Sequence, residues 1–189
     1  MTRPGLTPAR VVEVAAEIVD RHGVSVLTLA AVAQRLDVKT PSLYSHVDGI
    51  ESLRRAVALR AVADLGEACR TAAMGKAGGD ALAAIAVAYR DTALAHPGSY
   101  ALTQIARPGD PEWQAAADRV LQPILAALAG VGVKGTAAIH ATRMMRSALH
   151  GFVLLETGDG FGMNVSVENS FRHLVQSIVR AVSSGVTGT

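Results

Sequence analysis

The sequence predicts an all-α protein of about nine helices. Half of its 189 residues are apolar and only 4% are aromatic. Much of the apolar share is alanine, a composition that suits closely packed helices. Apolar residues recur at intervals of three and four along most of the chain, which is the helical period, and no segment has a convincing strand pattern. The length allows a core that needs no metal or disulfide.

The same totals exclude several classes of protein. The single cysteine, Cys69, cannot form an intramolecular disulfide, and no Cys/His cluster has zinc-ligand spacing. We therefore expect no metal and no other cofactor. The chain start lacks the apolar core of a signal peptide, and no run reaches the roughly 18 apolar residues that span a membrane. These features predict a cytoplasmic protein without membrane contact.

The net charge of +2 lies entirely in the N-terminal part of the chain. Residues 1–60 hold eight Lys and Arg against six Asp and Glu (8 − 6 = +2). The remaining residues hold ten of each sign (10 − 10 = 0). This distribution is a mild bias towards a phosphate-bearing partner at the N-terminal end.

Two helices are predicted at the start of the chain by their capping residues. Thr7 is placed as an N-cap and Pro8 as the first helical residue, while Gly23 ends that helix. Thr28 then caps a second helix, which runs to about Leu36.

A tight turn and a third, short helix follow. Asp37 stands where a left-handed residue is needed, a place that Asp tolerates. Thr40 is predicted to cap the third helix, Pro41 to start it, and His46 to lie near its end. Two short helices joined by a tight turn form a helix-turn-helix, whose second helix lies in the major groove of DNA.

The beginning of this third helix carries side chains suited to contact with DNA. Hydroxyl groups can donate to phosphate oxygens, lysine attracts phosphate, and a proline ring can contact a thymine methyl group. The residues predicted on these grounds are Lys39, Thr40, Pro41, Ser42 and Tyr44.

Residues 36–47 resemble the DNA-binding signature of the TetR family of transcriptional regulators. The signature ends in a pattern like L-Y-x-H/Y-F/V, which residues 43–47 match as LYSHV. The resemblance covers roughly the first 60 residues. It implies that Thr28 and Tyr44 contact phosphates and that residues 39–42 lie nearest the bases, and it places His46 among the DNA-binding residues.

The sequence departs from the family pattern at two positions. A lysine that contacts phosphate usually begins the fourth helix, but Ile50 stands there, which leaves Arg54 or Arg55 as replacements. Asp37 stands where glycine is usual in the turn. Taken singly, Tyr44 and His46 would also fit a second role, in which they only cap a small core.

Six further helices are predicted after the helix-turn-helix. Gly-rich and Pro-rich stretches separate them, and Pro123 interrupts or kinks one of them. Their expected ranges are 48–74, 80–96, 99–106, 112–129, 134–156 and 167–184.

Two of these helices are predicted to form a homodimer interface. The helix 134–156 is apolar almost all round and must be covered on more than one side, while 167–184 is a plain amphipath. Small residues along the first would let helices approach closely, so we expect two helices from each subunit to form a four-helix interface. Residues 149–156 also resemble the C-terminal domain type named for a Trp-His-Gly (WHG) motif, with Leu149 in place of tryptophan.

A pocket for a small molecule is predicted in the C-terminal part of the chain. Such pockets are mostly apolar with a few polar groups. For each candidate, simple packing in the core or solvation at the surface is the alternative. The candidates are Tyr89, Tyr100, Gln104, Trp113, His140, Arg143 and Met144.

The sequence as a whole predicts a ligand-responsive transcriptional regulator. Residues 1–47 would form the DNA-binding domain, the helix 48–74 the link, and residues 75–189 the ligand-binding and dimerisation domain. The expected activity is repression from a double-stranded palindromic operator, relieved by a small apolar effector, and no enzymatic activity is expected. The alternative is a helical ligand-binding or interaction protein without specific DNA binding.

Overall fold

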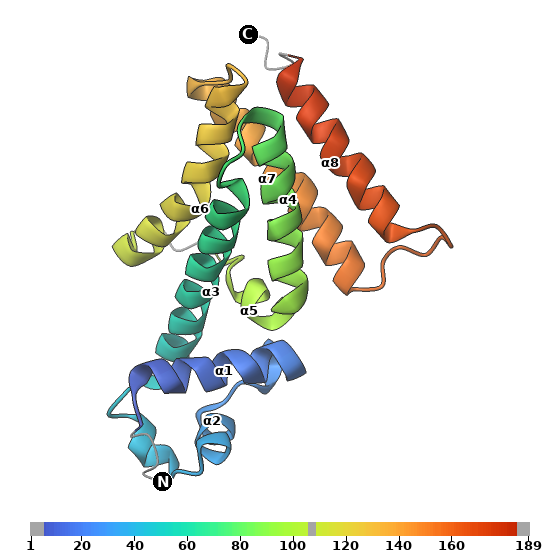
Figure 1. Cartoon of the computed structure of the whole chain (residues 1–189). Coiled ribbons are helices and arrows are strands. Elements are labelled where there is room, and N and C mark those ends of the chain that lie inside the picture. Colours follow the sequence, from blue (N-terminus) through green and yellow to red (C-terminus); the bar gives the residue numbers. More distant parts are fainter. Residues whose placement is uncertain (1–5, 106–108, 185–189) are drawn as a thin grey trace. The chain divides into compact units, whose positions relative to one another are not determined.

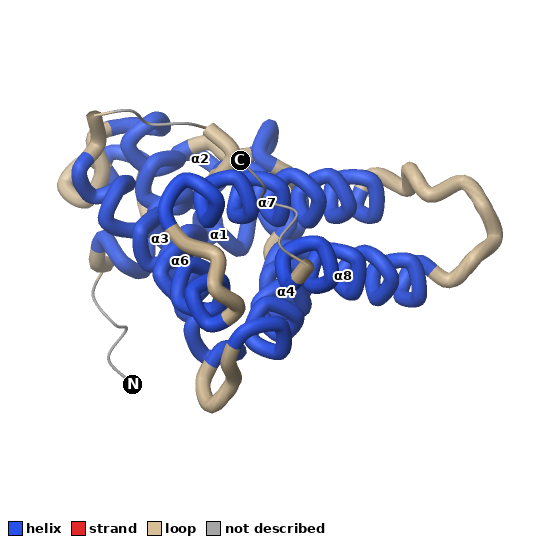
Figure 2. Tube along the Cα trace, turned by 90° about the horizontal axis from the view of Figure 1, so that it is seen from above, coloured by secondary structure: helices blue, strands red, loops and turns tan. Residues whose placement is uncertain are grey.

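The all-α prediction is confirmed. The computed structural model describes residues 6–105 and 109–184, and within these ranges it has eight α-helices, two 3-10 helices and no strand (Figures 1 and 2). The α-helices are α1 (Pro8–His22), α2 (Leu29–Leu36), α3 (Gly49–Ala73), α4 (Gly78–Ala95), α5 (Pro97–Leu102), α6 (Pro111–Gly130), α7 (Gly135–Thr157) and α8 (Val167–Ser183). The 3-10 helices are η1 (Val24–Val26) and η2 (Thr40–Leu43).

The chain folds into two compact units. The head unit comprises Met1–Val62 and Ala95–Trp113, and the body unit comprises Ala63–Leu94 and Gln114–Thr189. These units differ from the expected domains 1–47 and 75–189, because the head unit takes in the first half of α3, the whole of α5 and the beginning of α6.

The predicted ends of the first helices are confirmed. The hydroxyl oxygen of Thr7 accepts a hydrogen bond from the Arg10 amide at 3.2 Å, and that of Thr28 accepts one from the Ala31 amide at 3.1 Å. Both residues therefore satisfy amides that the first turn of a helix leaves unpaired. Gly23 ends α1 with a φ of +85°, which glycine adopts without strain.

The head unit is built around one apolar core. Side chains from α1, α2, η2 and α3 pack there together with Leu102 of α5, and Trp113 packs against the same cluster. The residues of α5 and the start of α6 thus complete the core of the head. This packing explains why residues 95–113 belong to it.

The body unit buries one face of α7. The buried side chains of this helix are Ala138, Ala141, Met145, Leu149 and Val153. The opposite face is exposed, so a single chain covers this largely apolar helix on one side only. α6 continues through Pro123 as one helix.

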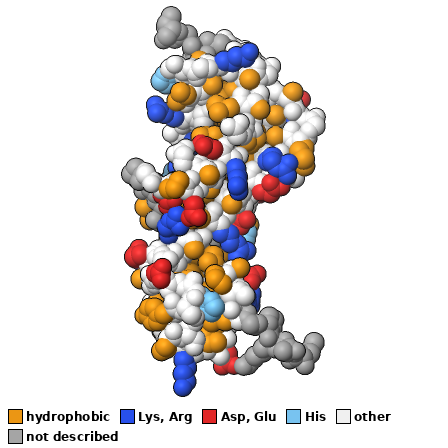
Figure 3. All heavy atoms as spheres, turned by 90° about the vertical axis from the view of Figure 1, so that its left-hand side faces the viewer, with side chains coloured by type: hydrophobic (Ala, Val, Ile, Leu, Met, Phe, Trp, Pro, Cys, Tyr) orange, Lys and Arg blue, Asp and Glu red, His pale blue; other side chains and the backbone are white. Residues whose placement is uncertain are grey.

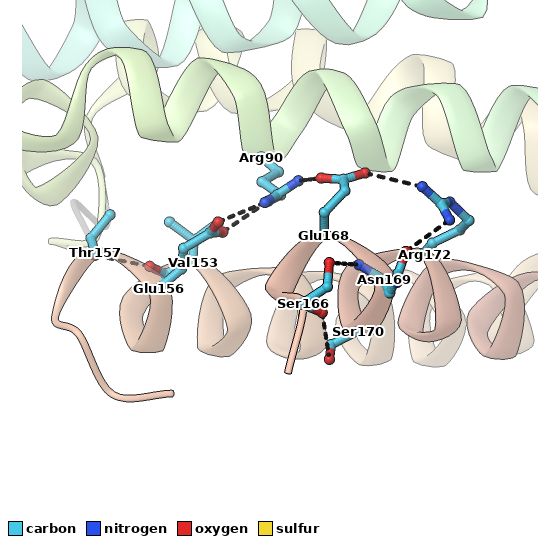
Figure 4. A network of polar contacts seen from close by, with 9 residues as sticks. All are labelled: Arg90, Val153, Glu156, Thr157, Ser166, Glu168, Asn169, Ser170 and Arg172. Atoms are coloured by element: carbon cyan, nitrogen blue, oxygen red, sulfur yellow. Dashed lines mark hydrogen bonds and ion pairs between the residues drawn. The ribbon is translucent and has the colours of Figure 1, made fainter. Parts of the chain in front are cut away.

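An arginine cluster joins three helices of the body unit (Figure 4). Arg90 on α4 donates two hydrogen bonds to Glu156 on α7, at 2.8 and 2.6 Å, and one to Glu168 on α8 at 2.7 Å. Its guanidinium also lies over the Phe171 ring, 4.5 Å from the centroid. Such bidentate, charge-assisted bonds fix the relative orientation of the helices that they connect.

Within the described ranges, no single helix is long and apolar enough to cross a membrane. Only α6 and α7 taken together reach that length and composition, and they are bent by 119° where they meet.

Candidate DNA-binding interface

The turn between α2 and η2 has the predicted left-handed residue. Asp37 has φ 55° and ψ 46°, and its amide donates to the Gln34 carbonyl at 3.2 Å. The next amide, of Val38, donates to the Ala33 carbonyl at 3.0 Å. These bonds satisfy carbonyl groups at the end of α2 and terminate that helix.

The third helix was predicted to be an α-helix, but the structure has a 3-10 helix at this place. Residues Thr40–Leu43 form the 3-10 helix η2, and the side chain of Thr40 does not cap it, because Lys39 holds the N-cap position without a side-chain hydrogen bond. Hydrogen-bonded turns then continue the chain, since the His46 amide donates to the Leu43 carbonyl at 2.8 Å. A segment this short gains little from the regular α pattern, which explains the tighter form.

The side chains of this segment divide between core and solvent. Leu43 and Val47 are buried in the head core, whereas Lys39, Pro41 and Ser42 are exposed and Thr40 and His46 are half-buried. Tyr44 is 59% exposed. Tyr44 therefore does not cap the core. The buried side chains of Leu43 and Val47 fix the segment to the head core, and its other side chains face solvent wholly or in part. Thr28 is also exposed, with its hydroxyl oxygen used in the N-cap.

Neither arginine proposed to replace the missing lysine at Ile50 is a free cation. Arg54 donates to Glu51 at 2.6 Å. Arg55 donates to both carboxylate oxygens of Asp110, at 2.7 and 2.8 Å, and to Glu112 at 2.6 Å. Hydrogen bonds from Arg55 and from the Trp113 amide lower the pKa of Asp110 to about 2. Arg55 thus holds the beginning of α6 on the head.

A second set of contacts holds α5 on α1. One oxygen of Asp20 accepts a hydrogen bond from the Ser99 amide at 2.7 Å, and the other lies 3.0 Å from Nδ1 of His96. A Cβ atom on Gly98 would lie only 2.0 Å from the Val19 carbonyl oxygen. Glycine is required here because the two backbones approach so closely.

Sequence reasoning missed these contacts between distant parts of the chain. α4 ends at Ala95, close to the predicted end at residue 96, and Pro97 then opens α5. The short helix was predicted over residues 99–106, of which Ala106 lies outside the described residues. A Pro-Gly pair after a helix usually indicates a turn. The only sequence signal for the contact with α1 was the acidic side chain of Asp20, which can accept a hydrogen bond from the first turn of α5.

The side chains predicted to line a ligand pocket are distributed over both units. Tyr100, Gln104 and Trp113 belong to the head unit, and Tyr89 is buried in the body unit. The three residues predicted on α7 are all exposed: His140, Arg143 and Met144. Gln104 donates to the Thr103 hydroxyl at 2.7 Å, within its own turn. Among the described residues, no three His, Cys, Asp or Glu side chains are grouped so that they could hold a metal.

The architecture and the turn at Asp37 define a helix-turn-helix protein, and the comparisons identify its family. A family model described as "Tetracyclin repressor-like, C-terminal domain" matches residues 82–178. The uncharacterized HTH-type transcriptional regulator Rv0681 of Mycobacterium tuberculosis is 43% identical over 159 residues, covering 82% of this chain and 73% of that protein. The uncharacterized HTH-type transcriptional regulator YobS of Bacillus subtilis is 31% identical, covering 94% and 93% respectively.

The chain belongs to the TetR family of transcriptional regulators, as the resemblance in the sequence predicted. Solved structures share its fold. A protein of unknown function from Rhodococcus sp. RHA1 superposes with a TM-score of 0.81 at 20% identity, covering 96% of this chain and 97% of that one. A TetR variant from Acinetobacter baumannii in complex with minocycline gives a TM-score of 0.74 at 20% identity, covering 98% and 100%.

Proposed function

We propose that this protein is a ligand-responsive, DNA-binding repressor that acts as a homodimer on a palindromic operator. The observation that carries the proposal is the exposed segment from Lys39 to Tyr44, which is held outward by the left-handed turn at Asp37 and by the buried side chains of Leu43 and Val47. A turn with these exposed groups can approach base edges and phosphates.

The dimer would bring two copies of this segment to adjacent major grooves. Their separation must be about one turn of DNA, roughly 34 to 36 Å, or a multiple of it. An effector that binds better to a dimer with another separation would weaken DNA binding by its difference in affinity for the two states.

The proposed dimer interface is the outer face of α7 together with α8. The exposed residues Thr136, Arg143, Ser147 and Leu154 follow one line along α7, opposite to its buried side. A Cβ atom on Gly151 would meet nothing within 4 Å, so a second helix could approach there. A self-complementary contact of this kind gives a two-fold homodimer.

The effector is proposed to be a small, mostly apolar molecule. Of the predicted pocket residues, Tyr89 is the one buried in the body unit, and it is our first candidate for contact with the effector. His140, Arg143 and Met144 lie on the outer face of α7, so we propose that they lie in the dimer interface rather than in a pocket. Tyr100, Gln104 and Trp113 remain predictions from the sequence.

Selection of bound sequences from random duplex DNA tests the proposed function. Enrichment of a palindrome is the expected result. If no sequence is enriched, the alternative of a helical ligand-binding or interaction protein is favoured. The ion pairs that occupy Arg54 and Arg55 are the feature of the head that would suit this alternative.

Two substitutions test the assignment of the DNA-contacting segment. Lys39→Ala should weaken binding and lower the slope of log affinity against log salt by about one, because it removes one phosphate-seeking cation. Tyr44→Phe should weaken binding through the loss of a hydroxyl donor, at a cost of about 1 kcal/mol. Thermal unfolding should stay near wild type in both variants, since the two side chains are exposed.

Lys76→Ala is the matched control, because Lys76 is an exposed lysine between α3 and α4. It should bind DNA like the wild type. If the Lys39 and Tyr44 variants also bind like wild type, the segment does not contact DNA.

A further inference from the structure

The hairpin of α7 and α8 carries more basic than acidic side chains. Its residues 134–184 contain three carboxylates, Glu156, Asp159 and Glu168. The basic side chains in the same range are Lys134, Arg143, Arg146, Arg172 and Arg180.

Two of the three carboxylates are already neutralised from outside the hairpin. Glu156 and Glu168 both accept hydrogen bonds from Arg90 on α4, and Glu168 also lies 3.8 Å from Arg172 (Figure 4). Glu168 has a lowered pKa, mainly through its bond to Arg90. Asp159, in the connection between the helices, is the remaining acidic residue.

Four cations of the hairpin have no ion-pair partner among the residues that the structure describes. They are Lys134, Arg143, Arg146 and Arg180, and all four are exposed. Arg143 lies in the middle of the outer face of α7, about two turns after Thr136 and one turn before Ser147. Arg180 lies on the exposed side of α8, opposite to Phe171, Val175, Ile178 and Val182, which are buried.

The proposed dimer interface carries Arg143 on the outer face of α7 and Arg180 on the exposed side of α8, and we propose that anions in solution strengthen the dimer. The inference rests on the proposed homodimer. A two-fold axis presents each copy with the same surface, so Arg143 and Arg180 meet a partner surface that is neutral or basic. Like charges brought together oppose association until counter-ions screen or bind them.

The occupant of this face is a second copy and not an acidic protein. The open space at Gly151 and the small side chain of Ser147 permit close helix approach. Exposed apolar side chains flank them, with Met144 at 41%, Leu154 at 53% and Leu155 at 49% exposure. Burial of these groups favours association between copies, while the cations limit its strength at low salt.

The test is the dimer dissociation constant of the full chain, measured without DNA by analytical ultracentrifugation. Raising sodium chloride from roughly 0.05 to 0.5 M shortens the range of repulsion between exposed charges about threefold. Over this interval the dissociation constant should fall about threefold or more. Arg143→Gln should lower the dissociation constant at low salt and reduce its dependence on salt. Arg119→Gln is the matched control, because it removes the same charge from an exposed position on α6.

Gly151→Arg separates the failure of this inference from the failure of the proposed dimer. The variant should be monomeric, because a large side chain at this position blocks the partner, while its Cβ atom would meet nothing within 4 Å in its own chain. If Gly151→Arg still forms the wild-type dimer, the proposed interface is wrong. If Gly151→Arg is monomeric, the proposed interface is supported. If in that case salt weakens the wild-type dimer, or if Arg143→Gln has the same dissociation constant and salt dependence as Arg119→Gln, anions do not strengthen the dimer.

Discussion

At the scale of single residues, most cations of the head are neutralised within the head. Arg10 pairs with Glu13 at 2.6 Å, Arg54 with Glu51, and Arg55 with Asp110 and Glu112. Lys39 forms no ion pair among the described residues. The excess of two positive charges was readable from the sequence, but the pairing of Arg55 with Asp110 was not, because 55 residues separate them. On the face shown in Figure 3, acidic, basic and apolar side chains are likewise intermixed.

The ion pair of Asp110 predicts a specific dependence of stability on pH. Its pKa in the folded chain is about 2, below the ordinary value of 3.8. Its ionised form therefore stabilises the head above about pH 4, and this contribution is lost as the pH falls through about 2. Asp110→Asn should unfold at a lower temperature than wild type at neutral pH, with a difference that narrows between pH 4 and 2.

Circular dichroism melts across this range measure the difference between the two proteins. Asp118→Asn, at an exposed position on α6, should show no such narrowing. A difference between Asp110→Asn and wild type that stays constant down to pH 2 would contradict the assigned ion pair.

At the scale of helices, the sequence predicted those helix ends that depend on capping and turn residues close by in the chain. The caps at Thr7 and Thr28 and the left-handed Asp37 were predicted because each depends on residues within one turn. The type of η2 and the start of α5 were not, because these short segments take their form from the surface on which they pack. α5 begins at Pro97, where Asp20 of another helix supplies the acceptor for the Ser99 amide.

The close contact between α5 and α1 can be tested by adding one methyl group. Gly98→Ala should destabilise the head by roughly 2 to 3 kcal/mol, because its Cβ atom would overlap backbone atoms that cannot rotate away. The nearest of them is the Val19 carbonyl oxygen, at 2.0 Å. Amide hydrogen exchange in α1 and α5 measures the local loss of stability.

Gly162→Ala is the control for this substitution. Its Cβ atom would meet nothing within 4 Å, so exchange should match the wild type. Wild-type protection in Gly98→Ala would mean that α5 does not lie against α1 in solution.

At the scale of the whole molecule, the chain passes between its two units three times. The head is formed by Met1–Val62 together with Ala95–Trp113. The sequence placed the end of the DNA-binding domain at residue 47, because the periodicity of α5 and α6 carries no information on which unit they pack against. Only the folded chain brings Leu102 into the core of the head.

This arrangement predicts that residues 1–62 do not fold alone. Such a fragment lacks Leu102 of the core, the Trp113 ring packed against it, and the Asp110 partner of Arg55. Its proton–nitrogen NMR spectrum should show the narrow dispersion of an unfolded chain. The same fragment joined to residues 95–113 through a flexible Gly/Ser linker should give a dispersed spectrum. A dispersed spectrum from residues 1–62 alone would show that the added segment is dispensable.

The position of Trp113 gives the protein an internal optical probe. It is the single tryptophan of the chain, it is half-buried against the head core, and its amide donates to Asp110 at 3.1 Å. Indole emission shifts to longer wavelength when the ring becomes exposed to water. The tryptophan emission of the unlabelled protein therefore reports on the head unit, and a titration with DNA can be followed through it.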